Sequence, residues 1–173
     1  AAPGIVVAIG VIVPVFYIDK KINHLFKFFE KDIGLIISGS IIILIFAYLV
    51  RFLSVAFNPI EAGMEKISEK IDYSALNLGA SKNILFFKIH LPMLSSSCLI
   101  AYLLVFIDIL KELPLTLILR PFNFSTLSVY TFEYASSEQL ISASLPALLI
   151  TVIGLIPLIL VNRILNHKLR KTK

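Results

Sequence analysis

Four long runs without a charged residue constrain the fold of this chain more than any other feature. They are 18 to 24 residues long and cover residues 1–18, 33–50, 89–107 and 139–162. The hydrocarbon core of a membrane, about 30 Å thick, is crossed by roughly 20 helical residues. Only 16% of the chain is charged, compared with about 25% in soluble domains. The runs therefore predict an all-α integral membrane protein, a bundle of about four transmembrane helices.

The basic C-terminal tail sets the predicted orientation. Its cations are Arg163, Lys168, Arg170, Lys171 and Lys173. Cations gather on the cytoplasmic side of membrane helices, so we expect a cytoplasmic C-terminus. With spans near residues 4–18, 34–57, 93–110 and 142–162, residues 58–92 are cytoplasmic, and residues 19–32 and 112–140 are external. Ten Lys and Arg residues then lie inside and six outside.

Two details of the charge distribution bear on this topology. Four of the external cations oppose it, although three acids accompany them: Lys20, Lys21, Lys27 and Lys31, with Asp19, Glu30 and Asp32. Arg51 is counted inside, because it lies near the end of its predicted span and can extend toward the headgroups.

Several function classes lack support in the sequence. A single cysteine, Cys98, allows no internal disulfide or paired-cysteine metal site. The three histidines are isolated, and no phosphate-binding loop motif occurs, so we expect no metal, no cofactor and no bound ATP. The net charge is +5, and the basic residues are most concentrated in the C-terminal tail. This distribution does not indicate a nucleic-acid partner. The chain starts at Ala1 rather than Met, and we interpret residues 1–173 as one N-terminally truncated membrane domain.

The predicted cytoplasmic loop, residues 58–92, has helical periodicity. One stripe of apolar residues recurs at helical spacing: Ile60, Met64, Ile67 and Ile71. A second short helix is expected over residues 72–78, with Asp72 as its N-cap and Gly79 in a left-handed conformation after it. Ser81 is expected to cap a third helix, and Pro92 to open the next span. Periodicity alone equally fits an amphipathic hairpin that rests on lipid headgroups.

The spacing within this loop matches a known motif. Gly79 is followed by nine residues and then by Ile89, His90, Leu91 and Pro92. Ala75 stands where the motif has its last alanine, whereas Tyr73 replaces its glutamate and Ser74 its first alanine. This pattern resembles the E-A-A, G, I-x-L-P signature of ABC importer permeases. In that family the segment is a coupling helix that docks on the ATPase subunit. The resemblance implies that role for Tyr73, Ser74, Ala75, Gly79, Ile89, Leu91 and Pro92.

A second block narrows the resemblance. Lys111-Glu112-Leu113-Pro114, followed by Leu119-Arg120-Pro121-Phe122, is similar to a region of ferric-iron permeases. This similarity implies an importer of the bacterial inner membrane that has no enzymatic activity of its own. Its expected partners are cytoplasmic ATPase subunits, an external solute-binding protein, a second permease lobe in the same chain or in a dimer, and membrane lipid. A permease for thiamine or a polyamine, a membrane scaffold and a membrane-embedded enzyme are the alternatives.

Charged residues close one of the predicted spans. Asp108, Lys111 and Glu112 are spaced i, i+3 and i+4, so we expect them to share a helix face and to pair. Charges at membrane depth usually face a bundle interior or a water-filled path. These three are therefore candidates for the translocation path or its external gate, or alternatively mark the headgroup boundary. Arg120 is expected either to meet the binding protein or to extend toward the headgroups.

Overall fold

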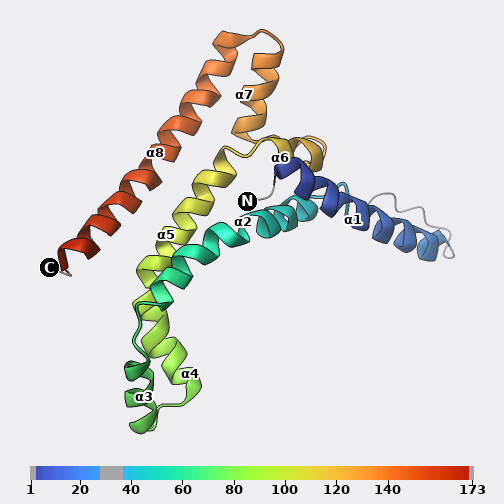
Figure 1. The fold of residues 1–173 in the computed structure, drawn as a ribbon. Helices are drawn as coiled ribbons and strands as arrows, with labels where there is room; N and C mark the ends of the chain where they lie inside the picture. The colour runs from blue at the N-terminus through green and yellow to red at the C-terminus, as the bar shows by residue number, and fades with distance from the viewer. Residues whose placement is uncertain (1–2, 28–36, 172–173) are drawn as a thin grey trace. The chain divides into compact units, whose positions relative to one another are not determined.

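The computed structural model describes residues 3–27 and 37–171, and all regular structure in these ranges is helical (Figure 1). In chain order the elements are α1 (Gly4–Lys27), α2 (Ile41–Met64), α3 (Glu69–Asn77), α4 (Lys82–Ile84), the π-helical turn η1 (Leu85–His90), α5 (Leu91–Leu110), α6 (Pro114–Leu119), α7 (Leu127–Ser136) and α8 (Leu140–Lys171). This confirms the all-α prediction.

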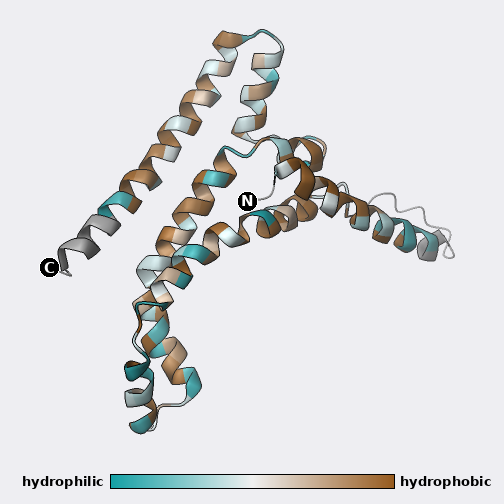
Figure 2. Cartoon of the chain, in the orientation of Figure 1, coloured by the Kyte–Doolittle hydropathy of each residue, from teal (hydrophilic) through white to brown (hydrophobic). Residues whose placement is uncertain are grey.

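Three helical segments are long and apolar enough to cross a membrane. They are Ile41–Met64, Lys82–Leu110 and Leu140–Arg163 among the residues described, and Figure 2 shows their apolar character. The sequence predicts about four spans, and α1, which holds the remaining predicted span, is not among these three. The apolar part of α1 within the described residues runs from Gly4 to Ile18. Asp19, Lys20 and Lys21 follow directly.

The helix bounds differ from the predictions around the central loop. α2 runs through Pro59 to Met64, so the loop begins later than residue 58. Ile60 and Met64 therefore belong to α2, whereas Ile67 lies in the turn before α3 and Ile71 lies within α3. The four residues do not form one helical stripe. Arg51 lies near the middle of α2 rather than near its end.

Pro92 lies inside a helix instead of opening one. The third helical segment begins at Lys82 and continues without a break through α4, η1 and α5 to Leu110. A proline within a helix removes one i→i−4 hydrogen bond, and its ring crowds the carbonyl one turn earlier. The π turn lies in that preceding turn, where the Leu91 N–H donates to the carbonyl oxygen of Phe86, five residues back. The wider turn accommodates the proline.

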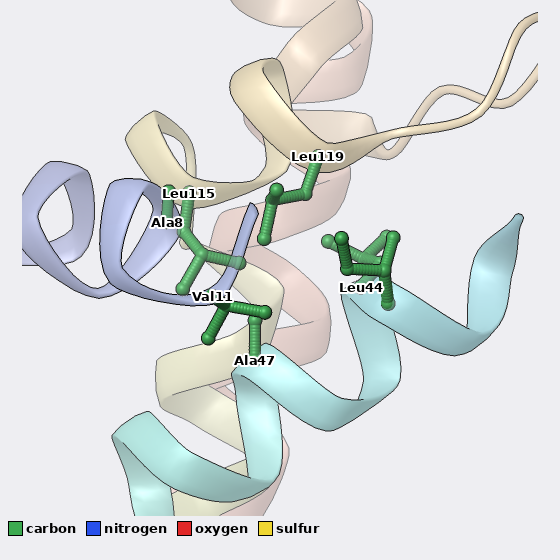
Figure 3. Packing of buried hydrophobic residues seen from close by; sticks show 7 residues of the cluster. Ala8, Val11, Leu44, Ala47, Leu115 and Leu119 are labelled. Atoms are coloured by element: carbon green, nitrogen blue, oxygen red, sulfur yellow. The ribbon is translucent and has the colours of Figure 1, made fainter. Parts of the chain in front are cut away.

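The chain divides into two compact units. The first comprises Ala1–Leu53 and Asp108–Gly154. Its core is made of apolar side chains from α1, α2 and α6 that point toward one another (Figure 3). The core residues are Ala8, Val11, Ile43, Leu44, Ala47, Leu115 and Leu119. The small side chains of Ala8 and Ala47 are fully buried, which lets the helix backbones approach closely.

The second unit comprises Ser54–Ile107 and Leu155–Lys173. Gly63 of α2 lies against α5, where a Cβ would overlap Ser97 Oγ and lie 3.0 Å from a Leu94 methyl. Leu94, Ser97 and Ile100 are the buried face of α5 at this level. Close helix packing through small residues is typical of membrane bundles.

Some predicted features lie outside the described residues. These are Glu30, Lys31, Asp32, the first part of the predicted span at residues 34–36, and Lys173, together with the side chains of Lys27, Lys168, Arg170 and Lys171. The orientation of the C-terminus therefore stays a prediction. The predicted external stretch contains α6 and α7.

Candidate functional site

Within the loop that carries the permease signature, helix α3 exposes apolar side chains that a partner could contact. It begins after Ser68, whose hydroxyl accepts a hydrogen bond from the Lys70 N–H at 3.3 Å. The prediction of Asp72 as N-cap is therefore wrong, because the helix starts three residues earlier and Ser68 supplies the capping oxygen. Tyr73 is 64% exposed, and Leu76 and Leu78 extend the exposed apolar surface.

Gly79 ends α3 in the predicted left-handed conformation, with φ of 84°. Its N–H donates to Leu76 O at 2.9 Å, and the Ala80 N–H donates to Ala75 O at 3.0 Å. These two bonds make a Schellman motif, in which a residue at positive φ satisfies the last carbonyls of the helix. A Cβ at Gly79 would meet nothing within 4 Å. The requirement for glycine is thus one of backbone conformation and not of space.

The remaining signature residues divide between α3 and the long helix. Ser74 is exposed and its hydroxyl donates to Lys70 O at 2.7 Å, whereas Ala75 is buried. Ile89 is half-buried in η1, and Leu91 and Pro92 are the first, exposed residues of α5. Ser81 caps α4, as predicted, and accepts from the Ile84 N–H. The two halves of the signature are thus a short capped helix and the start of the helical segment Lys82–Leu110.

One side-chain contact joins these halves. Asp72 Oδ1 lies 3.0 Å from Nε2 of His90, the last residue of η1. The His90 side chain is 10% exposed and that of Asp72 is 35% exposed. Asp72, the acid at the start of the signature, is therefore directed to the chain's own π turn.

The first unit contains a cluster of polar side chains centred on Glu112. Arg51 Nη1 of α2 lies 2.6 Å from Glu112 Oε1, with 19% of the arginine and 5% of the glutamate side chain exposed. The same oxygen accepts the Leu115 N–H at 3.1 Å and so caps the first turn of α6. Glu112 thus ties the middle of α2 to α6.

Hydroxyl groups complete the surroundings of Glu112. Its backbone carbonyl accepts from Ser128 Oγ at 2.8 Å and from Thr116 Oγ1 at 3.1 Å. The Tyr48 hydroxyl also bonds Thr116 Oγ1. Because the single hydroxyl proton of Thr116 goes to the Glu112 carbonyl, Tyr48 is the donor in that bond. Helices α2, α6 and α7 are linked through this group.

Gly4, the first residue of α1, lies directly on the ion pair. A Cβ at this position would overlap Arg51 Nη1 and lie 2.8 Å from Glu112 Oε1. A side chain at this position would require the ion pair to shift. The N-terminus of a helix carries partial positive charge, which favours the glutamate beside it.

The structure separates Glu112 from Asp108 and Lys111, the other two residues predicted for the external gate. Lys111 Nζ and Asp108 Oδ1 pair at 3.0 Å, as expected, and both side chains are partly exposed. α5 ends at Leu110, so Glu112 lies beyond the helix and pairs with Arg51 instead. The expectation that all three share one helix face is therefore wrong. Their role in a translocation path stays a prediction.

Arg120 is held inside its own segment. Its guanidinium donates to Glu133 Oε1 at 2.6 Å and to Ser125 Oγ at 2.7 Å. The bond to Glu133 fastens the connection after α6 to α7, and the bond to Ser125 lies within that connection. The structure thus gives Arg120 a local structural partner that neither of its sequence-based roles foresees.

Asp19, in the second half of α1, is 1% exposed and fixes the turn before α2. It accepts the backbone N–H groups of Ile37 at 3.1 Å and Ser38 at 2.8 Å, and also the Ser38 hydroxyl. Burial by itself raises the pKa of Asp19, but the three hydrogen bonds together hold this pKa below its ordinary value. The aspartate is a structural anion.

The described residues offer little for metal or redox chemistry. No group of three His, Cys, Asp or Glu side chains there could hold a metal ion. Cys98 is a half-buried free thiol. The polar groups described above bind one another and position helices.

Comparison with known proteins decides the family. Residues 1–171 match the family described as binding-protein-dependent transport system inner membrane component. The chain belongs to that family. Together with the three apolar helices, this makes it a membrane permease component of a transport system. No solved structure matches the chain.

A relative within the family is named for iron. The chain is 28% identical over 163 residues to the Fe(3+)-transport system permease protein FbpB 2 of Haemophilus influenzae. The match covers 94% of this chain but 29% of that protein. The match confirms the resemblance to ferric-iron permeases that residues 111–122 indicate.

Two contacts of the site were missed by sequence reasoning. Arg51 and Glu112 are 61 positions apart, and Asp72 and His90 are 18 apart, so no local spacing reveals either pair. A signal did exist for the first pair, because a lone arginine inside an apolar run requires a partner at membrane depth. For the second, the only sequence cue was an acid and a histidine in the same loop.

Proposed function

We propose that this chain is the membrane-spanning part of an ATP-driven importer that moves ferric iron from an external binding protein to the cytoplasm. The family membership and the relative named for Fe(3+) transport support this substrate. ATP hydrolysis belongs to separate cytoplasmic subunits in this proposal. A second permease lobe, in the same polypeptide or in a dimer, completes the pore, and the C-terminus is cytoplasmic.

The observation that carries the proposal is the form of α3. It is a nine-residue helix with a serine cap at one end and the Gly79 Schellman motif at the other. Tyr73 and Leu76 of α3 are exposed, as is Leu78 directly after the helix. A short helix fixed at both ends transmits a displacement, whereas a flexible loop absorbs it. This is the property that a coupling element between an ATPase and a pore requires.

We also propose that Asp108 and Lys111, at the end of α5, face the external part of the translocation path. Both side chains are partly exposed and carry opposite charges at the end of a helix in which Asp108 is the only charged residue. Glu112 takes part by holding α6 through Arg51 and the Leu115 N–H. Loss of transport in Asp108→Asn without loss of folding supports this role, and unchanged transport contradicts it.

Co-purification tests the docking role. The full-length protein is purified in detergent with the ATPase subunit from its own genome, beside a variant in which residues 73–79 are a Gly/Ser linker. A matched variant replaces residues 122–125, in the connection after α6, with the same kind of linker. We expect the ATPase to be lost only from the first variant. Equal binding by all three proteins contradicts the proposal.

A further inference from the structure

We propose that Asp72 and His90 are positioning residues that carry the movement of α3 into the helical segment Lys82–Leu110. This inference rests on the proposed coupling function and names the side chains through which it acts. Asp72 Oδ1 and His90 Nε2 are 3.0 Å apart. They join α3, which presents exposed apolar side chains, to the helical segment that is long and apolar enough to cross the membrane.

The burial pattern of α3 places the contact on its inner side. Ala75 is 7% exposed and Asp72 is half-buried, whereas Tyr73 is 64% exposed. Asp72 and Ala75 are three residues apart and so lie on one face of the helix. A partner that presses on the exposed face would therefore push Asp72 toward η1, where the α3 helix contacts the long segment.

His90 depends on Asp72 for its orientation. The ring is buried, and within the described part of the chain its Nδ1 has no hydrogen-bond partner. Nearly all buried polar atoms in proteins are paired, so the Asp72 bond is the polar interaction that fixes this ring. Removal of the carboxylate leaves the imidazole without either bond. The aspartate thus controls where the histidine points.

The position of His90 makes its orientation matter for the spanning helix. It is the last residue of the π turn and stands two residues before Pro92. Hydrogen bonding is already altered here, because the Leu91 N–H reaches the Phe86 carbonyl rather than the one four residues back. π turns and prolines are the places where helices bend. A force applied at His90 therefore acts at the most deformable point of the segment.

The test uses the complete transporter in proteoliposomes, with its ATPase and binding protein. The variants are Asp72→Ala, His90→Ala, their combination, and Asp72→Asn, which keeps an oxygen that accepts the Nε2–H bond. Glu69→Ala is the matched control, since it removes an exposed acid from the first turn of the same helix. The readouts are ATPase co-purification, ATP hydrolysis, and solute transported per ATP.

We expect both alanine variants to keep the ATPase but to transport about fivefold less solute per ATP, the low end of usual coupling factors. The double variant should be no worse than either single one, because the two residues act as one contact. Asp72→Asn should keep most of the coupling, and Glu69→Ala all of it.

Four results would overturn the inference. They are unchanged transport per ATP in the alanine variants, additive losses in the double variant, an equal loss in Glu69→Ala, and loss of the ATPase from the alanine variants, which would make the pair part of the docking surface. Failure of the proposed function is distinguishable, because the wild type itself would then bind no ATPase or transport nothing.

Discussion

Arg51 Nη1 and Glu112 Oε1 lie 2.6 Å apart, joining the middle of α2 to the first turn of α6. Both charges are largely removed from solvent, and the first residue of α1 packs on them without a side chain. The pair thus positions three helices of the first unit. Removing one partner of a buried pair leaves an uncompensated charge, which costs more than removing both.

The first prediction concerns this pair. Arg51→Met should destabilise the protein by about 3–5 kcal/mol, because Glu112 is then buried without a cation. Arg51→Met combined with Glu112→Gln should recover most of the loss, since glutamine is neutral and still accepts the Leu115 N–H. Thermal unfolding in detergent measures these differences.

Lys111→Met is the control for the loss of a cation. Its partner Asp108 and the lysine itself are partly exposed, and such pairs contribute less than about 1 kcal/mol. An Arg51→Met protein as stable as Lys111→Met, or a double variant less stable than the single one, would speak against the account of the pair.

The second prediction concerns Gly4. Gly4→Ala places a methyl group on Arg51 Nη1 and next to Glu112 Oε1, so the ion pair must shift at a cost of about 1–3 kcal/mol. Gly10→Ala in the same helix is the matched control, because its Cβ meets nothing within 4 Å and alanine has the higher helix propensity. Unfolding curves should show Gly4→Ala destabilised and Gly10→Ala unchanged or slightly stabilised. The reverse order would contradict the packing described here.

The third prediction concerns the end of α3. Gly79→Val must place a β-branched residue at a φ of 84°, which disfavours the left-handed turn. We expect it to lower the solute transported per ATP in the reconstituted transporter. Gly79→Asn is the control, because asparagine tolerates this conformation. Full coupling in Gly79→Val would refute the role of a rigid α3.

The fourth prediction follows from the hydrogen bonds of Asp19. Its folded-state pKa is lowered from the ordinary value of 3.8, so its contribution to stability is complete above that value and is lost as the pH falls below it. Wild-type protein should therefore lose stability below about pH 4 more steeply than Asp19→Asn. Glu65→Gln, which alters an exposed acid, should keep the wild-type dependence. If stability depended equally on pH in wild type and Asp19→Asn, the charge of Asp19 would not stabilise the fold.

The sequence was informative where a residue acts through its own backbone or its near neighbours. The left-handed Gly79, the Ser81 cap and the Asp108–Lys111 pair follow from local rules, and the structure has all three. The membrane-spanning helices followed from uncharged runs, because apolar surface decides insertion. The first run is not among the three spanning candidates of the described residues, because Asp19, Lys20 and Lys21 follow the apolar part of α1.

Contacts between distant parts of the chain could not be predicted in this way. Acids favour the N-cap position, which predicts Asp72 there, but Ser68 starts the helix and leaves Asp72 to bind His90. Helical spacing predicts Glu112 on the face of Asp108, but α5 ends at Leu110 and Glu112 lies beyond it. Helix ends decide both cases, and they depend on tertiary packing.

The most direct test of the central claim is ATP-dependent uptake of radioactive ferric iron. Proteoliposomes would hold the full-length permease with its ATPase, and the binding protein would be supplied loaded with iron. The account predicts that iron accumulates only with ATP and binding protein, and that excess thiamine or polyamine does not reduce it. ATP-dependent accumulation of thiamine or a polyamine in place of iron, or no uptake of any solute, would contradict it.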